Sequence, residues 1–86
     1  MAYRIEFSSS AANQLRRLPR TVQGRLTPHI DALAETPRPP GVKKLSDDTY
    51  RIRVGEYRVI YDIADQVLIV LVLSIGHRRE VYRRRR

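Results

Sequence analysis

The chain has 86 residues, 42% of them hydrophobic, which is enough for one small domain with a single modest core. Its 17 Lys and Arg against 9 Asp and Glu give a formal net charge of +8, which favours a polyanionic partner such as nucleic acid. The absence of cysteine excludes disulfides, a thiolate nucleophile and a cysteine-based zinc site, and two histidines are too few to indicate a metal centre. We therefore expect one domain over residues 1–86, with no cofactor and no metal.

The chain carries no membrane signal that we recognise. Its amino terminus lacks the apolar core of a signal peptide, and the apolar run 67–75 is far shorter than the roughly 20 residues that cross a bilayer. We expect a cytoplasmic protein with no membrane partner.

The first half of the chain predicts a strand followed by two helices. Residues 3–7 alternate apolar and polar side chains, as a strand does, and the serines at 8–10 can cap a helix that ends near Pro19. A second helix is expected over 20–35, with an apolar stripe that includes Leu26 and Ile30. Pro28 lies inside it and either kinks this helix or begins a new first turn.

A proline-rich connector at 36–44 leads into a hairpin of two strands over residues 50–63. A two-residue turn at Gly55-Glu56, of type II′, places Arg53 directly opposite Arg58, with Arg51 on the same face. Because like charges directly opposite are mildly destabilising, three arginines on one face favour an external polyphosphate. The alternative is that the arginine stems only shield the sheet while their charged groups stay in water.

The last part of the chain predicts one more strand after the hairpin, followed by a basic C-terminal end. The continuous apolar run 67–75 is rich in β-branched residues and suits a central strand. The arginine-rich end is either a solvated tail or a segment that Val81 and Tyr82 anchor, with the tyrosine stacking on a base. The expected fold is α+β, ordered β-α-α-β-β-β, with a mostly antiparallel four-stranded sheet, a helical pair on one face and a short basic C-terminal segment.

Two stretches, "YRIRVGEYRVIYDI" and "SIGHRREVY", resemble the signature regions of the RelE toxins, the RNA-cleaving members of the RelE/ParE superfamily in bacterial type II toxin–antitoxin systems. The order of the expected elements also resembles that family from end to end. The resemblance implies a toxin that cuts messenger RNA in the ribosomal A site without a metal and that a RelB-like antitoxin neutralises. It implies catalytic roles for Arg51, Arg53, Arg58, Arg78 and Tyr82, and RNA binding by Arg79, Arg83, Lys43 and Lys44.

The chain departs from the family at Arg51 and Arg53, where well-known members carry lysine. An arginine cannot serve as a base because its pKa stays above about 12. The 2′-hydroxyl proton must therefore pass to another group, and His77 and Tyr82 are the candidates. The alternative, which is favoured for a lone histidine, is that His77 is a turn residue after Gly76 with no chemical task.

Two other functions remain open from the sequence. One is a ParE-like toxin that inhibits DNA gyrase and cuts no RNA. The other is a catalytically inert module in which the arginines only bind nucleic acid.

Overall fold

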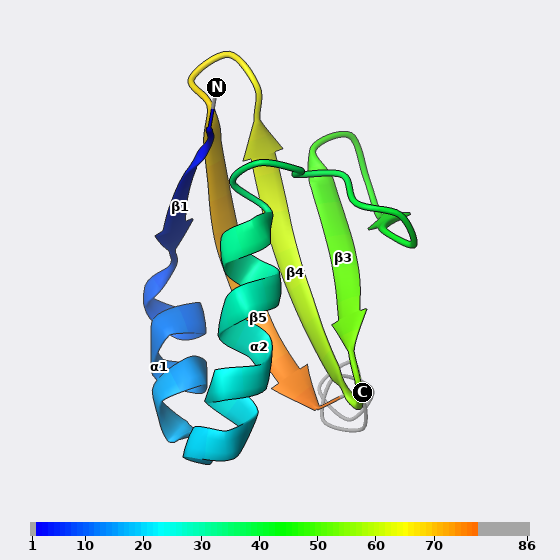
Figure 1. The fold of residues 1–86 in the computed structure, drawn as a ribbon. Coiled ribbons are helices and arrows are strands. Elements are labelled where there is room, and N and C mark those ends of the chain that lie inside the picture. The colour runs from blue at the N-terminus through cyan, green and yellow to red at the C-terminus, as the bar shows by residue number, and fades with distance from the viewer. Residues whose placement is uncertain (1, 78–86) are drawn as a thin grey trace.

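The computed structural model describes residues 2–77, which form two helices and a five-stranded sheet (Figure 1). No helix within these residues is long and apolar enough to cross a membrane. The elements in chain order are β1 (Arg4–Phe7), α1 (Ser9–Arg17), α2 (Arg20–Ala32), β2 (Lys43–Lys44), β3 (Thr49–Val54), β4 (Tyr57–Ala64) and β5 (Ile69–His77).

The sheet has the strand order β1-β5-β4-β3-β2, so β5 and β4 lie at its centre. Strand β1 runs parallel to β5, and every other neighbouring pair is antiparallel. The α+β class and the predicted order of the main elements are confirmed. The expected count of four strands is wrong by one, because the two-residue strand β2 pairs with β3 at the end of the proline-rich connector.

Each helix begins and ends for a local reason. The side chain of Ser8 caps α1, because its Oγ accepts a hydrogen bond from the backbone N–H of Ala11 at 3.0 Å. The same Oγ lies 3.0 Å from the carbonyl oxygen of Leu73, to which it donates, so the cap also fastens α1 to β5. Helix α2 runs through Pro28 as one element, so the alternative of a new first turn there is wrong, and the helix ends at Ala32 instead of residue 35.

Both helices cover one face of the sheet, and the core lies between them (Figure 1). Apolar side chains on the inner sides of the helices contact alternate residues of β3, β4 and β5. A helix repeats a face about every 3.6 residues and a strand every two, so each element presents one apolar face to the core. The buried apolar residues are Ala11, Leu26, Ile30, Leu33, Tyr50, Ile52, Val54, Val59, Tyr61, Ile63, Val70, Val72 and Ile75.

The β3–β4 hairpin has the predicted register. Val54 pairs with Tyr57, Ile52 with Val59, and Arg53 with Arg58. Gly55 has φ +61°, while Glu56 is not among the residues with positive φ, as a type II′ turn requires. The hairpin therefore presents one apolar face to the helices and one charged face away from them.

Strand β5 is irregular where it passes β4. Tyr61 pairs with Val72, but the preceding residue of β4, Ile60, pairs with Ser74, so Leu73 is an extra residue on β5. This β-bulge reverses the side of the sheet on which the later β5 residues lie. Ile75 thus returns to the helix-covered face, where it is buried.

Candidate nucleic-acid interface

Three arginines lie on the sheet face that the helices leave open. We call the surface formed by Arg51, Arg53 and Arg58 the arginine face. Arg53 and Arg58 are direct cross-strand partners, and Arg51 pairs with Ile60, two residues further along the same face. Two guanidinium groups on directly opposed residues repel each other. An anion between them would replace this repulsion by two attractive interactions.

The three arginines differ in exposure. Arg53 is exposed and Arg51 is partly buried, as expected for a surface that binds a ligand. Arg58 is only 7% exposed, which corrects the expectation that its side chain projects freely from an open face. Arg58 lies on the central strand β4, between Arg53 on β3 and Gly76 on β5.

The two candidate RNA-binding lysines lie on opposite sides of the sheet. Lys43 pairs with Arg51, so the register places it in the same row as the arginine face. Lys44 pairs with Tyr50, whose ring is buried on the helix-covered side. Both lysines are exposed on the short strand β2, but the register associates only Lys43 with the arginine face.

His77 lies on the other side of the sheet from the arginine face. It pairs with Tyr57, and their rings make an edge-to-face contact with centroids 5.4 Å apart. Tyr57 shares its face with the buried Val59. The structure therefore does not bring this candidate base to the three arginines, and the bulge at Leu73 is the reason. The other predicted site residues, Arg78, Arg79, Tyr82 and Arg83, lie outside the described residues.

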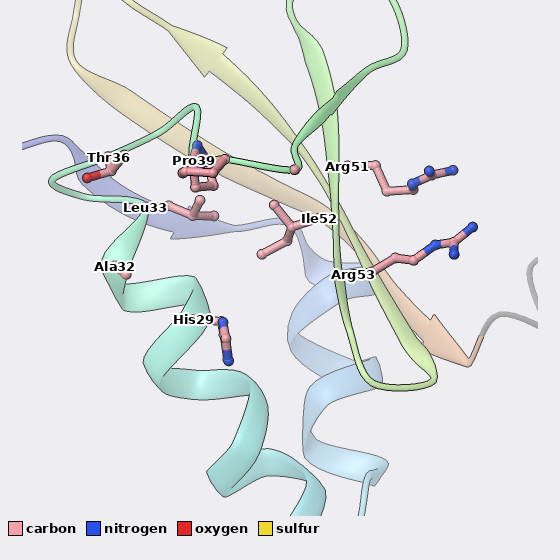
Figure 2. A pocket seen from close by; sticks show the side chains of 10 residues that line it. His29, Ala32, Leu33, Thr36, Pro39, Arg51, Ile52 and Arg53 are labelled. Carbon is pink, nitrogen blue, oxygen red and sulfur yellow. The ribbon is translucent and has the colours of Figure 1, made fainter.

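A groove of about 510 Å³, which the sequence did not predict, lies beside the arginine face on the helix side of β3. It is lined by the last turn of α2, by the connector at Pro39 and Pro40, and by the edge of β3. Figure 2 shows Ile52 on the α2 side of β3 and the side chains of Arg51 and Arg53 on the opposite side. Arg51 and Arg53 are nevertheless among the residues that line the groove, so the groove borders the arginine face.

A second feature that the sequence did not predict fixes the connector to the sheet. Arg38 Nη2 donates to Asp65 Oδ2 at 2.8 Å, and Arg38 Nε donates to the hydroxyl of Tyr50 at 3.1 Å. Tyr3 donates its hydroxyl proton to Asp65 Oδ1 at 2.6 Å, and Tyr61 donates its own to the carbonyl of Pro37 at 2.7 Å. We call this group the connector clamp.

The connector clamp shifts the pKa values of its members. Hydrogen bonds from Arg38 and then from Tyr3 lower the pKa of Asp65, because they stabilise its charged form. Burial raises the pKa of Tyr61 to about 12, since a phenolate would have to lose its water. Near pH 7 Asp65 is ionised and Tyr61 is neutral, the states in which their hydrogen bonds form, and both shifts act in the direction that favours these states.

Within residues 2–77, no three His, Asp or Glu side chains come together as a site for a metal ion. The chemistry that the described residues can supply is electrostatic: fixed positive charge on a sheet face beside a groove.

Comparison with known proteins agrees with this architecture. The family model for the ParE toxin of the type II toxin-antitoxin system parDE matches residues 5–82. The mRNA interferase toxin RelE of Escherichia coli (strain K12) is 33% identical over an alignment of 87 positions, which spans 95% of this chain and 92% of that protein. Toxin RelG of Mycobacterium tuberculosis is 29% identical and covers 98% of this chain and 100% of its own.

Solved structures give the same result. The isolated E. coli RelE toxin superposes with a TM-score of 0.80 at 28% identity, covering 96% of this chain and 98% of that one. The toxin of the intact E. coli RelBE toxin–antitoxin complex gives 0.79 at 31% identity, covering 88% and 96%. The chain therefore belongs to the RelE family, within the RelE/ParE superfamily of toxins of type II toxin–antitoxin systems.

Proposed function

We propose that this RelE-family toxin cleaves messenger RNA in the ribosomal A site and that the arginine face binds the phosphate at the cut. The observation that carries the proposal is the direct cross-strand pairing of Arg53 with Arg58, with Arg51 on the same face. Two directly opposed guanidinium groups repel each other, whereas both attract a phosphodiester that lies between them. The relative that is 33% identical is named an mRNA interferase, which supports the same activity.

The proposed reaction needs no group outside the RNA to form its new bond. The 2′-oxygen of the nucleotide before the cut attacks the adjacent phosphorus, and the bond from phosphorus to the 5′-oxygen breaks. The products are a 2′,3′-cyclic phosphate and a 5′-hydroxyl; the 2′-oxygen loses one proton and the 5′-oxygen gains one. Negative charge builds up on the phosphate oxygens, where Arg51, Arg53 and Arg58 stabilise it.

The three arginines cannot remove the 2′-proton, because arginine stays protonated. His77 lies with Tyr57 on the helix-covered side, so we do not assign it this role. The family resemblance then leaves Tyr82 to position or move the proton and Arg78 to assist the departing 5′-oxygen. Arg79 and Arg83 extend the contact along the RNA.

The partner that controls this activity is a cognate RelB-like antitoxin. RelB–RelE complexes are among the structures that this chain resembles. We propose that an acidic antitoxin segment covers the arginine face or displaces the basic C-terminal segment, because blocking phosphate access is the shortest route to neutralisation. Both partners would then act in the cytoplasm, where messenger and ribosomes are found.

The test is a cleavage assay on ribosomes with messenger in the A site. The proposal predicts cuts in the A-site codon, with cyclic-phosphate and 5′-hydroxyl ends, and an unchanged rate when the toxin alone is treated with EDTA and desalted before it meets the ribosomes. Intact messenger under these conditions, with the same preparation of toxin binding its antitoxin, would overturn it.

A second candidate, inhibition of DNA gyrase, is favoured by one observation: the matching family model is that of the ParE toxin. A supercoiling assay with purified gyrase separates the two functions. An inert nucleic-acid-binding module would be inactive in both assays and would still bind RNA.

A further inference from the structure

Two side chains of α1 bond the backbone of β5 where this strand runs past the end of β1. Within residues 2–77, the pairing of β1 with β5 ends at Val72. Further along β5, the carbonyl oxygen of Leu73 accepts a hydrogen bond from Ser8 Oγ at 3.0 Å. The N–H of Ile75 donates to Gln14 Oε1 at 2.7 Å. Helix α1 thus takes the place of a neighbouring strand along this part of β5.

The bond of Gln14 is specific to the bulged register of β5. Successive N–H groups of an antiparallel strand point alternately toward the partner strand and away from it. Leu73 is the extra residue of the bulge, so Gly76 lies opposite Arg58. The N–H of Ile75, one residue earlier, points away from β4 and toward α1. Without an extra residue, Ile75 itself would lie opposite Arg58, and its N–H would point to β4, out of reach of Gln14.

The register also decides which residue β5 places beside Arg58 on the open face. In the bulged register this residue is Gly76, which has no side chain. Ile75 then lies on the helix-covered side, where it is 2% exposed. In a regular register the isoleucine side chain would stand on the arginine face next to Arg58. It would take up the space beside the charged side chain and keep water and phosphate from it, at a cost in free energy.

Gln14 lies on the side of α1 that packs on the sheet. It is one helical turn from the buried Ala11, and its own side chain is half-buried. Such a position usually carries an apolar residue, because burial of apolar surface is favourable there. The bond to the Ile75 N–H explains the glutamine, since a donor left without an acceptor at the end of the sheet would be costly.

We propose that Gln14 is a positioning residue for the arginine face. Its bond, together with that of Ser8, holds β5 in the bulged register, and this register keeps Gly76 beside Arg58. Both α1 side chains act through the backbone of β5 and not on the RNA itself. The consequence for cleavage rests on the proposed function, whereas the consequence for the register does not.

The experiment compares three variants with the wild type. Gln14→Met has a side chain of similar length without the acceptor, and Gln14→Glu keeps an oxygen that can accept the bond. The matched control is Gln23→Met, because Gln23 is also half-buried and bonds a backbone group, the carbonyl of Leu18, at 2.8 Å. That bond lies within the helical pair. Ser8 is left unchanged because it also caps α1.

Hydrogen exchange of the Ile75 amide reports the register independently of any activity. In Gln14→Met this amide should exchange at least about tenfold faster than in the wild type, since the donor loses its acceptor. The nuclear Overhauser contact between the backbones of Arg58 and Gly76 should weaken in the same variant. Gln14→Glu and Gln23→Met should keep both signals.

Single-turnover cleavage of A-site messenger by saturating toxin measures the consequence for the arginine face. The rate constant of Gln14→Met should fall by about 10-fold to 100-fold, because a small misplacement of a group that stabilises the transition state is that costly. Gln14→Glu should restore most of the rate, and Gln23→Met should equal the wild type. Partial unfolding, which thermal melts detect, lowers the amplitude of cleavage and leaves the rate constant unchanged.

A further variant places a side chain beside Arg58 without disturbing α1. Gly76→Val puts a β-branched residue, which strands favour, directly opposite Arg58. Its cleavage rate constant should fall by at least about tenfold while the Ile75 amide keeps its slow exchange.

Three results would overturn the inference: unchanged Ile75 exchange in Gln14→Met, a wild-type rate constant in Gln14→Met despite fast exchange, or equal losses of rate in Gln14→Met and Gln23→Met. If the wild type cuts no messenger, the proposed function fails, and binding of single-stranded RNA becomes the readout. Weaker binding by Gln14→Met that Gln14→Glu restores then supports the inference, and unchanged binding overturns it.

Discussion

The two faces of the sheet differ in how their arginines are placed. On the helix-covered side and its connector, polar groups find partners within the chain: Arg38 bonds Asp65 and Tyr50, and Tyr61 bonds Pro37. On the open face, Arg53 lies directly opposite Arg58, a neighbour of the same charge. The bonds of Arg38 and Tyr61 stabilise the fold, whereas the opposition of Arg53 and Arg58 becomes favourable when an anion binds between them.

The comparison teaches that charge alone does not identify a functional arginine. Arg38 and Arg53 both carry a positive charge. The guanidinium of Arg38 bonds Asp65 and lies over the ring of Tyr50, 5.2 Å from the centroid. Its role is to hold the connector. Variants on the two sides should therefore separate activity from stability.

The largest expected effect is on activity, from Arg58→Met. Methionine keeps most of the volume of this buried stem but removes the charge, so the fold should be preserved. Losing one preorganised charge at a phosphoryl transition state typically lowers the rate about 10²-fold to 10³-fold. Single-turnover cleavage of A-site messenger, with thermal melts alongside, measures both. A loss of cleavage that only parallels unfolding would remove Arg58 from the site.

The next effect is on stability, from Tyr61→Phe on the other face. Tyr61 is 0% exposed and its hydroxyl donates to the Pro37 carbonyl at 2.7 Å. Removing the donor should lower the free energy of unfolding by about 1 to 3 kcal/mol. Denaturant melts give this value, and cleavage by the folded variant should equal that of the wild type. A selective loss of activity would mean that the connector clamp takes part in the chemistry.

Two glycine substitutions should change stability in opposite directions. Gly55 has φ +61° in the hairpin turn, so Gly55→Ala should destabilise by about 1 to 2 kcal/mol. Gly24 lies in α2 with no atom within 4 Å of an added Cβ, so Gly24→Ala should stabilise by roughly 0.4 to 1 kcal/mol. Equal shifts for both in denaturant melts would contradict the type II′ turn.

The neighbouring lysines of β2 test the register of the arginine face. Lys43 is in the row of Arg51 and Lys44 in the row of Tyr50. Lys43→Gln should weaken binding of single-stranded RNA by roughly fivefold at 0.1 M salt, and Lys44→Gln by less. Fluorescence anisotropy measures both. The reverse order would place RNA on the helix side of this edge.

The smallest effect concerns the pH dependence of the connector clamp. The pKa of Asp65 is lowered by Arg38 and Tyr3, so its stabilising contribution is present above its unfolded pKa of about 4 and is lost as pH falls through the folded value. The stability difference between wild type and Asp65→Asn should thus be constant from pH 5 to 8 and shrink below about pH 4. Melts across this range measure it; a difference that grows on acidification would contradict the lowered pKa.

Much of this fold follows from the sequence because local chemistry and periodicity agree. The two-residue turn at Gly55-Glu56 predicts the register of the hairpin, and this register places Arg53 opposite Arg58. Strand β2 escaped prediction because Lys43–Lys44 has no apolar pattern and exists only through its pairing with β3.

The faces of two site residues could not be predicted. Strict alternation along β5 from Val72 would place His77 on the open face, and only the extra residue Leu73 turns it to the other side. The burial of Arg58 was not predicted either, because the alternating pattern of the hairpin assigns this residue a face and not an exposure.

The most direct test of the central claim asks which surface touches the messenger. Ribosomes carrying a thiouridine-labelled messenger in the A site are irradiated with the Arg58→Met variant bound, and the crosslinked peptides are identified by mass spectrometry. The account predicts crosslinks in peptides from β3 and β4, which carry Arg51, Arg53 and position 58. Messenger crosslinks confined to α1 and α2 would contradict it.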